Sequence, residues 1–267
     1  MFIKPSWRIL TIGDGDLSFS ASIAQHIKPR SLVATIYDNK TSLTEKYSNK
    51  FFDKLTKYGI PVLTSIDVTD SSTWGGISLH SFDLVIFQFP LVPNNSTFQE
   101  HQHNKTVGSN NTINRLLLHR FLAHCFEFFL DKNGQRLAMI TSKDVKPYRQ
   151  WNIETSLVDN LKCDYIGQCD FNFDDYPNYQ IRNVDRNKFV KETQAISYFY
   201  SDKSQPHIAQ HLKVPNYCYD DDFCTICRVG PITTEKDWDA HIDSKRHRQM
   251  SIYEAQWQSK LDSINKL

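Results

Sequence analysis

The stretch ILTIGDGDLSFSASIA, residues 9–24, decides the fold of this chain. A short apolar run ends in a turn that holds two glycines and two aspartates, and a helix-like segment follows the turn. A strand that enters a tight glycine turn before a helix points backbone amides at the polar atoms of a ligand. The stretch therefore predicts a cofactor site of the nucleotide type at the end of the first strand.

Short β-rich runs alternate with helix-compatible segments up to about residue 201, which is typical of buried parallel strands joined by helices. We therefore predict an α/β domain over residues 1–201. Its expected strands are residues 8–12, 32–37, 61–66, 84–89, 136–141, 163–169 and 195–200. Its expected helices are residues 18–26, 42–58, 114–130 and 151–160, with a polar loop at residues 93–112 and a polar insert at 170–191.

The composition of the chain limits the classes of protein to which it can belong. Its 267 residues are 40% hydrophobic and 23% charged, which suits a globular protein in water. The net charge of +1 excludes a polycation, so any contact with nucleic acid needs local clusters of Lys and Arg. The sequence has no leader-like N-terminus and no apolar run that could cross a bilayer. We expect a nuclear or cytoplasmic protein that is neither secreted nor attached to a membrane.

The residues of the glycine turn favour one class of cofactor. Gly13 and Gly15 permit a sharp turn and a close approach of the backbone to a ligand. Ser18 stands where a dinucleotide fingerprint has Gly or Ala, and the carboxylates of Asp14 and Asp16 would repel a pyrophosphate. S-adenosylmethionine, which carries a sulfonium and no phosphate, fits this pattern better than NAD. The alternative is a strand-to-helix turn that binds no ligand.

Two further carboxylates follow the next two expected strands. Asp38 lies 23 positions after Gly15, where an acidic side chain can accept hydrogen bonds from both ribose hydroxyls. Asp67 adds a polar group at the carboxyl end of the third run. Both residues strengthen the prediction of an adenosyl cofactor.

Seven motifs in matching order between residues 8 and 200 resemble the yeast-type family of 25S rRNA uridine-N3 methyltransferases. They are GDGDLSFS, ATIYD, IDVTD, FDLVIFQFP, NRLLLHRF, YRQWNI and FDDYPNYQIR. The resemblance implies a Rossmann-like class I methyltransferase, with a seven-stranded sheet that ends in an antiparallel hairpin. It implies methylation of N3 of a uridine in large-subunit rRNA, free or in a preribosome, and with it a nucleolar location. By position it places Gly13, Asp14, Gly15 and Ser18 along S-adenosylmethionine, Asp38 on the ribose and Asp67 near the adenine.

The resemblance also places residues 87–90 where the target base approaches the methyl group. The family pattern there is closer to FNFPH, whereas this chain has Gln88 for the Asn and Leu91 for the His. Asn178 likewise stands where YPGY is expected. Because N3 lies in the base plane and carries a proton, transfer needs orientation, proximity and loss of that proton, but no covalent nucleophile.

The candidates for these roles come from three segments. Candidates for catalytic contacts are Gln88, Pro90, Lys143, Asp170 and Asp174. Phe87, Phe89, Tyr176 and Tyr179 are candidates for stacking on the flipped base. Each aromatic residue could equally pack in the core, and Lys143 could be a solvated loop charge.

A metal-binding pattern follows in the last fifth of the chain. Cys224 and Cys227, then thirteen residues to His241 and five to His247, give two thiolates and two imidazoles at zinc-finger spacing. A protein in a reducing compartment rarely forms disulfides, so a Zn²⁺ site explains the cysteine pair best. The segment WDAHIDSKRHR resembles U1-like or matrin-type fingers, with Trp238 as the small core and a basic helix face. That face, which would bind RNA phosphates, consists of Lys245, Arg246 and Arg248.

The expected organisation has four parts: a methyltransferase domain at 1–201, a linker at 202–222, the zinc finger at 223–250 and a helix at 251–267. The finger could bind RNA, recruit a protein or staple the C-terminal segment. The leading hypothesis is an RNA methyltransferase whose finger binds the same substrate. The alternative is a non-catalytic RNA- or protein-binding adaptor on a methyltransferase-like scaffold, which Gln88 and Leu91 keep open.

Overall fold

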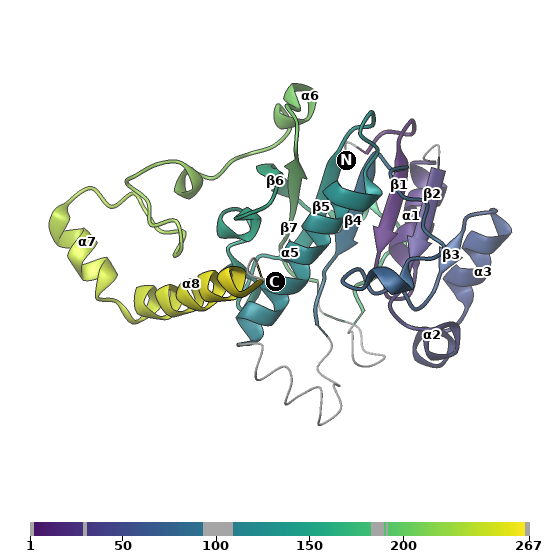
Figure 1. The fold of residues 1–267 in the computed structure, drawn as a ribbon, viewed down its shortest axis with the longest axis horizontal. Coiled ribbons are helices and arrows are strands. Elements are labelled where there is room, and N and C mark those ends of the chain that lie inside the picture. Colours follow the sequence, from purple (N-terminus) through teal and green to yellow (C-terminus); the bar gives the residue numbers. More distant parts are fainter. Residues whose placement is uncertain (1–2, 29–30, 93–108, 183–189, 191, 265–267) are drawn as a thin grey trace.

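The computed structural model describes residues 3–28, 31–92, 109–182, 190 and 192–264. The described residues hold a seven-stranded sheet in the order β3-β2-β1-β4-β5-β7-β6 (Figure 1). The five strands from β3 to β5 run parallel, whereas β7 is antiparallel to both neighbours. This order, with its antiparallel hairpin at one edge, confirms the α/β Rossmann-like methyltransferase fold. The strands are β1 (Arg8–Ile12), β2 (Ser31–Thr35), β3 (Val62–Leu63), β4 (Leu84–Gln88), β5 (Leu137–Lys143), β6 (Asp164–Asp170) and β7 (Ala195–Ser201).

Each face of the sheet is covered by its own apolar core. On one face, alternate residues of β1, β4 and β5 pack against α5 (Asn110–His124), and Phe121 is fully buried there. On the other face, the intervening strand residues pack against α1 (Ser18–His26), with Phe19 at the centre. The alternation follows from the two-residue period of a strand that is buried on both sides. The two cores hold the sheet together, so the carboxyl ends of the parallel strands β1, β2 and β4 lie at the same edge of the sheet.

The expected strands are all present, but two expected helices and the length of one expected strand need correction. The helix expected at 42–58 is two helices, α2 (Lys40–Tyr47) and α3 (Lys50–Lys57), because Ser48 adopts a positive φ of 79°. The helix expected at 151–160 is wrong: two single 3-10 turns, Tyr148–Trp151 and Ser156–Val158, replace it. The strand expected at 61–66 pairs over two residues only.

The polar loop and the helix that follows it also differ in their bounds. Residues 93–108 of the expected loop lie outside the described part of the chain. α5 begins earlier than expected, at Asn110, because the Ser109 side chain accepts a hydrogen bond from the backbone N–H of Thr112. Its continuation, Cys125–Phe129, is a π-helical turn.

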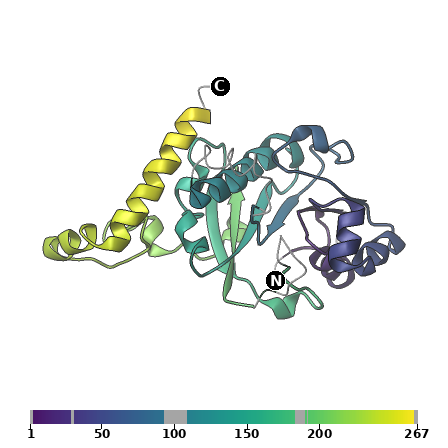
Figure 2. The same ribbon diagram turned by 90° about the horizontal axis from the view of Figure 1, so that it is seen from below.

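The segment after β7 is structured and returns to the body of the protein. The expected linker contains α6 (Pro206–Ala209), and Lys213 forms an isolated bridge with Gln168 of β6. α7 (Glu235–Ile242) and α8 (Lys245–Ile264) follow. Figures 1 and 2 show α7 standing away from the sheet and α8 running back toward α5. None of the described helices is both long and apolar enough to cross a membrane.

The finger and the C-terminal helix are continuous, whereas we predicted a boundary between them after residue 250. α8 begins inside the metal-ligand pattern and ends in the main core, where Trp257 is 0% exposed. The indole N–H of Trp257 donates to the carbonyl of Ser156 at 2.8 Å. A second link is buried: the Arg228 guanidinium, 4% exposed, pairs with the Glu154 carboxylate, 1% exposed. Helix α8, the hydrogen bond of the Trp257 indole and the ion pair between Arg228 and Glu154 together fix the finger to the domain that contains the sheet.

Candidate functional site

The glycine turn is held in place by β2 and β4. The backbone N–H of Asp14 donates to the carbonyl of Thr35 at 2.9 Å, so the turn follows the end of β2. Gly13 has a φ of 60°, and a Cβ there would lie 2.9 Å from the ring of Phe87. The turn therefore requires glycine both for its backbone angle and for its close approach to β4. Since Ile12 is in register with Phe87, the turn lies beside the end of β4.

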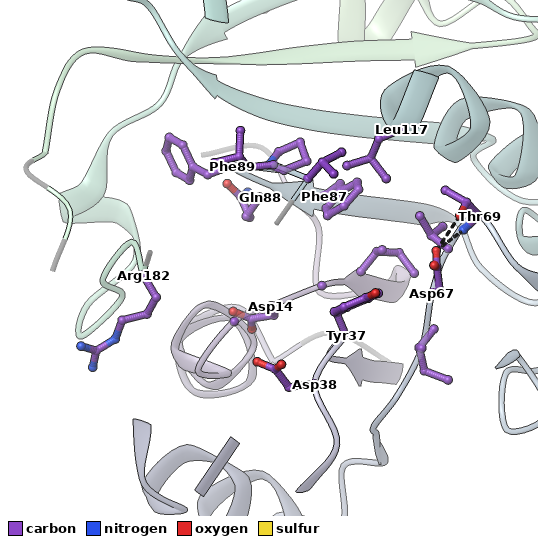
Figure 3. Close-up of a pocket in the computed structure, with 18 of the residues that line it drawn as sticks. Asp14, Tyr37, Asp38, Asp67, Thr69, Phe87, Gln88, Phe89, Leu117 and Arg182 are labelled. Carbon is purple, nitrogen blue, oxygen red and sulfur yellow. Dashed lines mark hydrogen bonds between the residues drawn. The ribbon is translucent and has the colours of Figure 1, made fainter. Parts of the chain in front are cut away.

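A cavity of about 880 Å³ opens at this edge of the sheet (Figure 3). Its volume lies within the range of small-molecule and cofactor sites. The residues expected at the site that line it are Gly13, Asp14, Gly15, Asp38, Asp67, Phe87, Gln88, Phe89, Pro90 and Tyr179. The topology thus brings together five of the six expected cofactor residues and two of the five candidates for catalytic contacts.

The carboxylates lie along one side of this cavity (Figure 3). Burial raises the pKa of Asp14 to about 7, and the nearby charge of Asp16 adds to the rise, although the N–H of Ser20 donates to Asp14 at 2.6 Å. Asp16 itself pairs with Arg182 at 2.6 Å. These two aspartates of the turn therefore differ, because within the described part of the chain only Asp16 has a cationic partner.

The other two carboxylates have local partners. Asp38 pairs with Lys46 of α2 at 2.8 Å, so a cation already lies on the carboxylate expected to bind ribose. Asp67 accepts hydrogen bonds from the backbone N–H and the hydroxyl of Thr69, at 2.8 and 2.7 Å. The second contact fixes the Asp67 side chain at the end of the third strand segment.

Gln88 faces the carboxylates from the end of β4 (Figure 3). It is 7% exposed, and neither its amide nitrogen nor its amide oxygen has a hydrogen-bond partner among the described residues. A buried amide without partners costs about 1–3 kcal/mol of stability, which is characteristic of a group that a ligand completes. The next residue, Phe89, has a φ of 47°, a conformation that non-glycine residues rarely adopt and that is often found at functional sites.

Aromatic rings from the insert after β6 pack beside Gln88. Phe89 stacks with Phe173, with ring centroids 6.1 Å apart and planes at 12°. Tyr179 stacks on the Phe89 ring, with ring centroids 6.4 Å apart and planes at 29°, and Tyr179 also lines the cavity. Tyr176 is different: it packs on Phe19 at 4.8 Å in the core and does not line the cavity.

Besides Tyr176, four of the expected site residues lie outside the cavity lining. The Ser18 hydroxyl accepts a hydrogen bond from the backbone N–H of Gln180 at 3.3 Å, which joins α1 to the aromatic insert. Lys143 ends β5, where burial lowers the pKa of its ammonium. Asp170 and Asp174 are exposed on the insert. The cavity therefore gives no support to these four as ligand contacts, and their roles remain predictions.

Several cavity residues were not identified from the sequence. Arg182 ends the motif FDDYPNYQIR, which could have drawn attention to it. Lys46, Arg120 and Lys260 carry no local signal, because each comes from a helix whose position depends on the tertiary fold. Tyr37, Thr69 and Leu117 are further lining residues that sequence reasoning missed.

The four expected metal ligands come together in the finger. The ligand atoms of Cys224, Cys227, His241 and His247 all lie within 4.8 Å of one another. The Nδ1 atom of His247 is 3.5 Å from one sulfur, 3.6 Å from the other and 3.2 Å from His241 Nε2. Tetrahedral Zn²⁺ with ordinary bond lengths requires about 3.5 Å for sulfur to nitrogen and about 3.3 Å for nitrogen to nitrogen. The set therefore fits a tetrahedral metal ion, with Trp238 only half-buried beside it.

Comparisons with known proteins agree with this arrangement. Residues 10–183 match the family model described as BMT5-like, rRNA (uridine-N3-)-methyltransferase. An uncharacterized protein, At4g26485, and the heavy metal-associated isoprenylated plant protein 41, both from Arabidopsis thaliana, are 26% and 27% identical. Those matches cover 64% and 67% of this chain, and 79% and 33% of the relatives, so the chain spans about a third of the second one.

Similarity to solved structures is weaker. The chain is 11% identical to M. jannaschii TYW2 in complex with AdoMet, with a TM-score of 0.41, over 75% of this chain and 71% of that one. It is 13% identical to a methyltransferase from Pyrococcus furiosus, with a TM-score of 0.45, over 76% and 78%. The family match covers more than half of the chain and includes the glycine turn, Gln88 and Arg182. The chain belongs to the BMT5-like rRNA (uridine-N3-)-methyltransferase family.

Proposed function

We propose that this chain transfers the methyl group of S-adenosylmethionine to N3 of a uridine in large-subunit rRNA, with Gln88 orienting the base. The observation that carries this proposal is the buried amide of Gln88, which has no hydrogen-bond partner among the residues that the structure describes and lies in the cavity that faces the glycine turn. Membership of the rRNA uridine-N3 methyltransferase family supports the reaction class. The same membership disfavours the alternative of a non-catalytic adaptor.

The cofactor side of the cavity would be formed by the ends of the first three strand segments. Gly13 and Gly15 provide the close backbone approach, Asp38 would accept from the ribose hydroxyls, and Asp67 would lie near the adenine. When bound, S-adenosylmethionine supplies an electrophilic methyl group on a sulfonium. For Asp38 to bind ribose, Lys46 must share or leave that carboxylate, because it occupies both oxygens at 2.8 and 3.0 Å.

The base side would be formed by β4 and the aromatic insert. The Gln88 amide can donate to a uracil carbonyl next to N3, while Phe89 and Tyr179 offer aromatic surface to the base. A base held in this way presents the N3 edge to the methyl group, so catalysis rests on orientation and proximity. Pro90, which follows in the cavity lining, restricts the backbone at this point.

The Cys2His2 group would bind Zn²⁺, and the finger would add affinity for RNA. Of its three expected phosphate ligands, Arg246 donates to the Cys227 carbonyl and Arg248 pairs with Asp243 at 3.1 Å. Lys245 is exposed, and its side chain has no partner within the described ranges. We propose residues 1–201 as the catalytic domain and 223–250 as the finger, with α8 extending from the finger into the catalytic core.

The test compares the wild-type chain with Gln88→Leu, which removes the amide at similar size, and with Gln210→Ala, an exposed glutamine on the segment after β7. Unmodified large-subunit rRNA is incubated with S-adenosylmethionine, and nucleosides are quantified by mass spectrometry. We expect N3-methyluridine from wild type and Gln210→Ala, and roughly 10- to 100-fold slower formation with Gln88→Leu at unchanged cofactor affinity. Metal-dependent RNA binding without N3-methyluridine from the wild type would support the adaptor instead.

A further inference from the structure

Among the described residues, the cationic side chains of the cavity divide into a paired and an unpaired group. Four carboxylates and four cationic side chains line it. Two of the cations, Lys46 and Arg182, are paired with Asp38 and Asp16. The remaining two, Arg120 and Lys260, have no ion-pair partner within the described ranges. They come from helices α5 and α8, whereas the carboxylates come from the strand ends.

Arg120 reaches the cavity because of its angular position around the axis of α5. Ile113, Leu116, Leu117 and Arg120 all line the cavity, and their spacing of three and four residues places them on one face of the helix. Arg115 lies on another face, where it pairs with Glu254 at 3.0 Å and donates to the Ser156 hydroxyl at 2.6 Å. The exposed Arg120 is thus the arginine of this pair that remains available to a ligand.

Lys260 reaches the same cavity because α8 is anchored next to it. Glu254, Trp257 and Leu261 form the face of α8 that packs on the catalytic domain, and the last two are at most 1% exposed. Gln258 adds a hydrogen bond to Asp159 at 2.8 Å. Lys260 lies between these anchors in sequence and is half-buried at the cavity. Its position is therefore set by the helix and not by a flexible loop.

We propose that Arg120 and Lys260 form a binding site for a backbone phosphate of the substrate RNA at the mouth of the active site. S-adenosylmethionine carries two positive groups and one carboxylate, so its net positive charge suits the carboxylate side. An RNA strand that delivers a base to Gln88 carries a phosphate on each side of that nucleotide, and two unpaired cations complement it. The inference rests on the proposed function, since it takes RNA as the substrate.

The site also joins the finger to the catalytic cavity. His247 and Lys260 lie on the same helix, thirteen residues or about 20 Å apart. An extended RNA strand spans that distance with a few nucleotides. One helix thus connects the finger to the proposed phosphate site at the cavity.

The experiment measures binding of a fluorescein-labelled oligouridylate to the full metal-loaded chain, by anisotropy over a series of salt concentrations. Lys260→Ala and Arg120→Ala should each weaken binding roughly five-fold at about 0.1 M salt and reduce the slope of log affinity against log salt by about 0.7. Lys260→Arg should restore both values. Lys132→Ala, an exposed lysine before β5 at the opposite edge of the sheet, should match wild type.

Calorimetric titration with S-adenosylmethionine separates the two possible ligands. We expect unchanged cofactor affinity in Lys260→Ala and Arg120→Ala, with melting temperatures equal to wild type. Weaker cofactor binding with intact RNA binding would assign the cations to the cofactor carboxylate and overturn the inference, as would RNA binding equal to that of Lys132→Ala. A wild-type chain that binds oligouridylate but forms no N3-methyluridine on rRNA would refute the proposed function alone.

Discussion

Asp14, the buried carboxylate of the glycine turn, should make the stability of the protein depend on pH. Burial raises its pKa from an ordinary value of 3.8 to about 7, so between these values the folded chain holds a proton that the unfolded chain has lost. The free energy of unfolding must then fall as the pH rises through this window. From about pH 5 to about pH 8 this one group should lower it by about 2–3 kcal/mol.

The assay is urea unfolding at several pH values across that window for wild type, Asp14→Asn and the control Asp53→Asn, an exposed residue of α3. The amide that Asp14→Asn introduces keeps an acceptor for the Ser20 N–H but cannot ionise. We expect the stability advantage of the wild type over Asp14→Asn to shrink with rising pH, while Asp53→Asn follows wild type. Parallel curves for wild type and Asp14→Asn would show that Asp14 titrates normally and refute the reasoning.

The same titration should appear in cofactor binding. If the ionised Asp14 attracts the sulfonium cofactor, affinity should follow the ionised fraction, which grows from about one tenth at about pH 6 to about one half at about pH 7. Calorimetry should then show roughly five-fold tighter binding at the higher of these two pH values. The affinity of Asp14→Asn should stay constant over this interval; a comparable change in that variant would assign the effect to another group.

Three further perturbations test the remaining structure. Gly13→Ala places a Cβ against Phe87 at a positive φ, so it should cost about 1–2 kcal/mol of stability and abolish calorimetric cofactor binding; normal binding would contradict the tight turn. Arg228→Met leaves the buried Glu154 charge unpaired and should cost about 3–5 kcal/mol in urea unfolding, most of which a double variant with Glu154→Leu should recover; a loss that the double variant fails to recover would count against the ion-pair explanation. Chelation of the metal should expose the amides of α7 to hydrogen exchange while those around Trp257 stay protected; equal protection throughout would rule out a metal-dependent finger.

The sheet and the part of the cavity lined by the glycine turn, Asp38 and Asp67 were predictable from the sequence because they depend on local signals. The glycine at position 13 predicts a turn by its residue type. Asp38 and Asp67 each follow an apolar run that forms a parallel strand, so strand pairing alone brings Gly13, Asp38 and Asp67 to one edge of the sheet. The Cys2His2 group was predictable for the same reason, since the spacing of its four residues in the sequence indicates that they come together. In each case a short segment of the sequence contains the residue types and the spacing that indicate the feature.

Features that depend on tertiary contacts were not predictable. The break at Ser48 is stabilised by a hydrogen bond between Thr44 and Asn49, which a helical pattern over residues 42–58 hides. Lys260 belongs to the cavity only because Trp257 and Leu261 dock α8 on the catalytic domain, far along the chain from β7. The exposed positions of Asp170 and Asp174 show the converse: suitable residue types near a strand end do not by themselves reach the cavity.

The late position of Trp257 in the chain has a consequence for biosynthesis. The indole fills the catalytic core, yet the ribosome makes it after the whole finger. At ordinary rates of elongation, the stretch from residue 222 to residue 261 takes roughly 2–8 s, during which the nascent catalytic domain exposes the apolar surface that α8 will cover. Prematurely terminated chains that end in the finger keep that surface open, which should make them targets of chaperones and proteases.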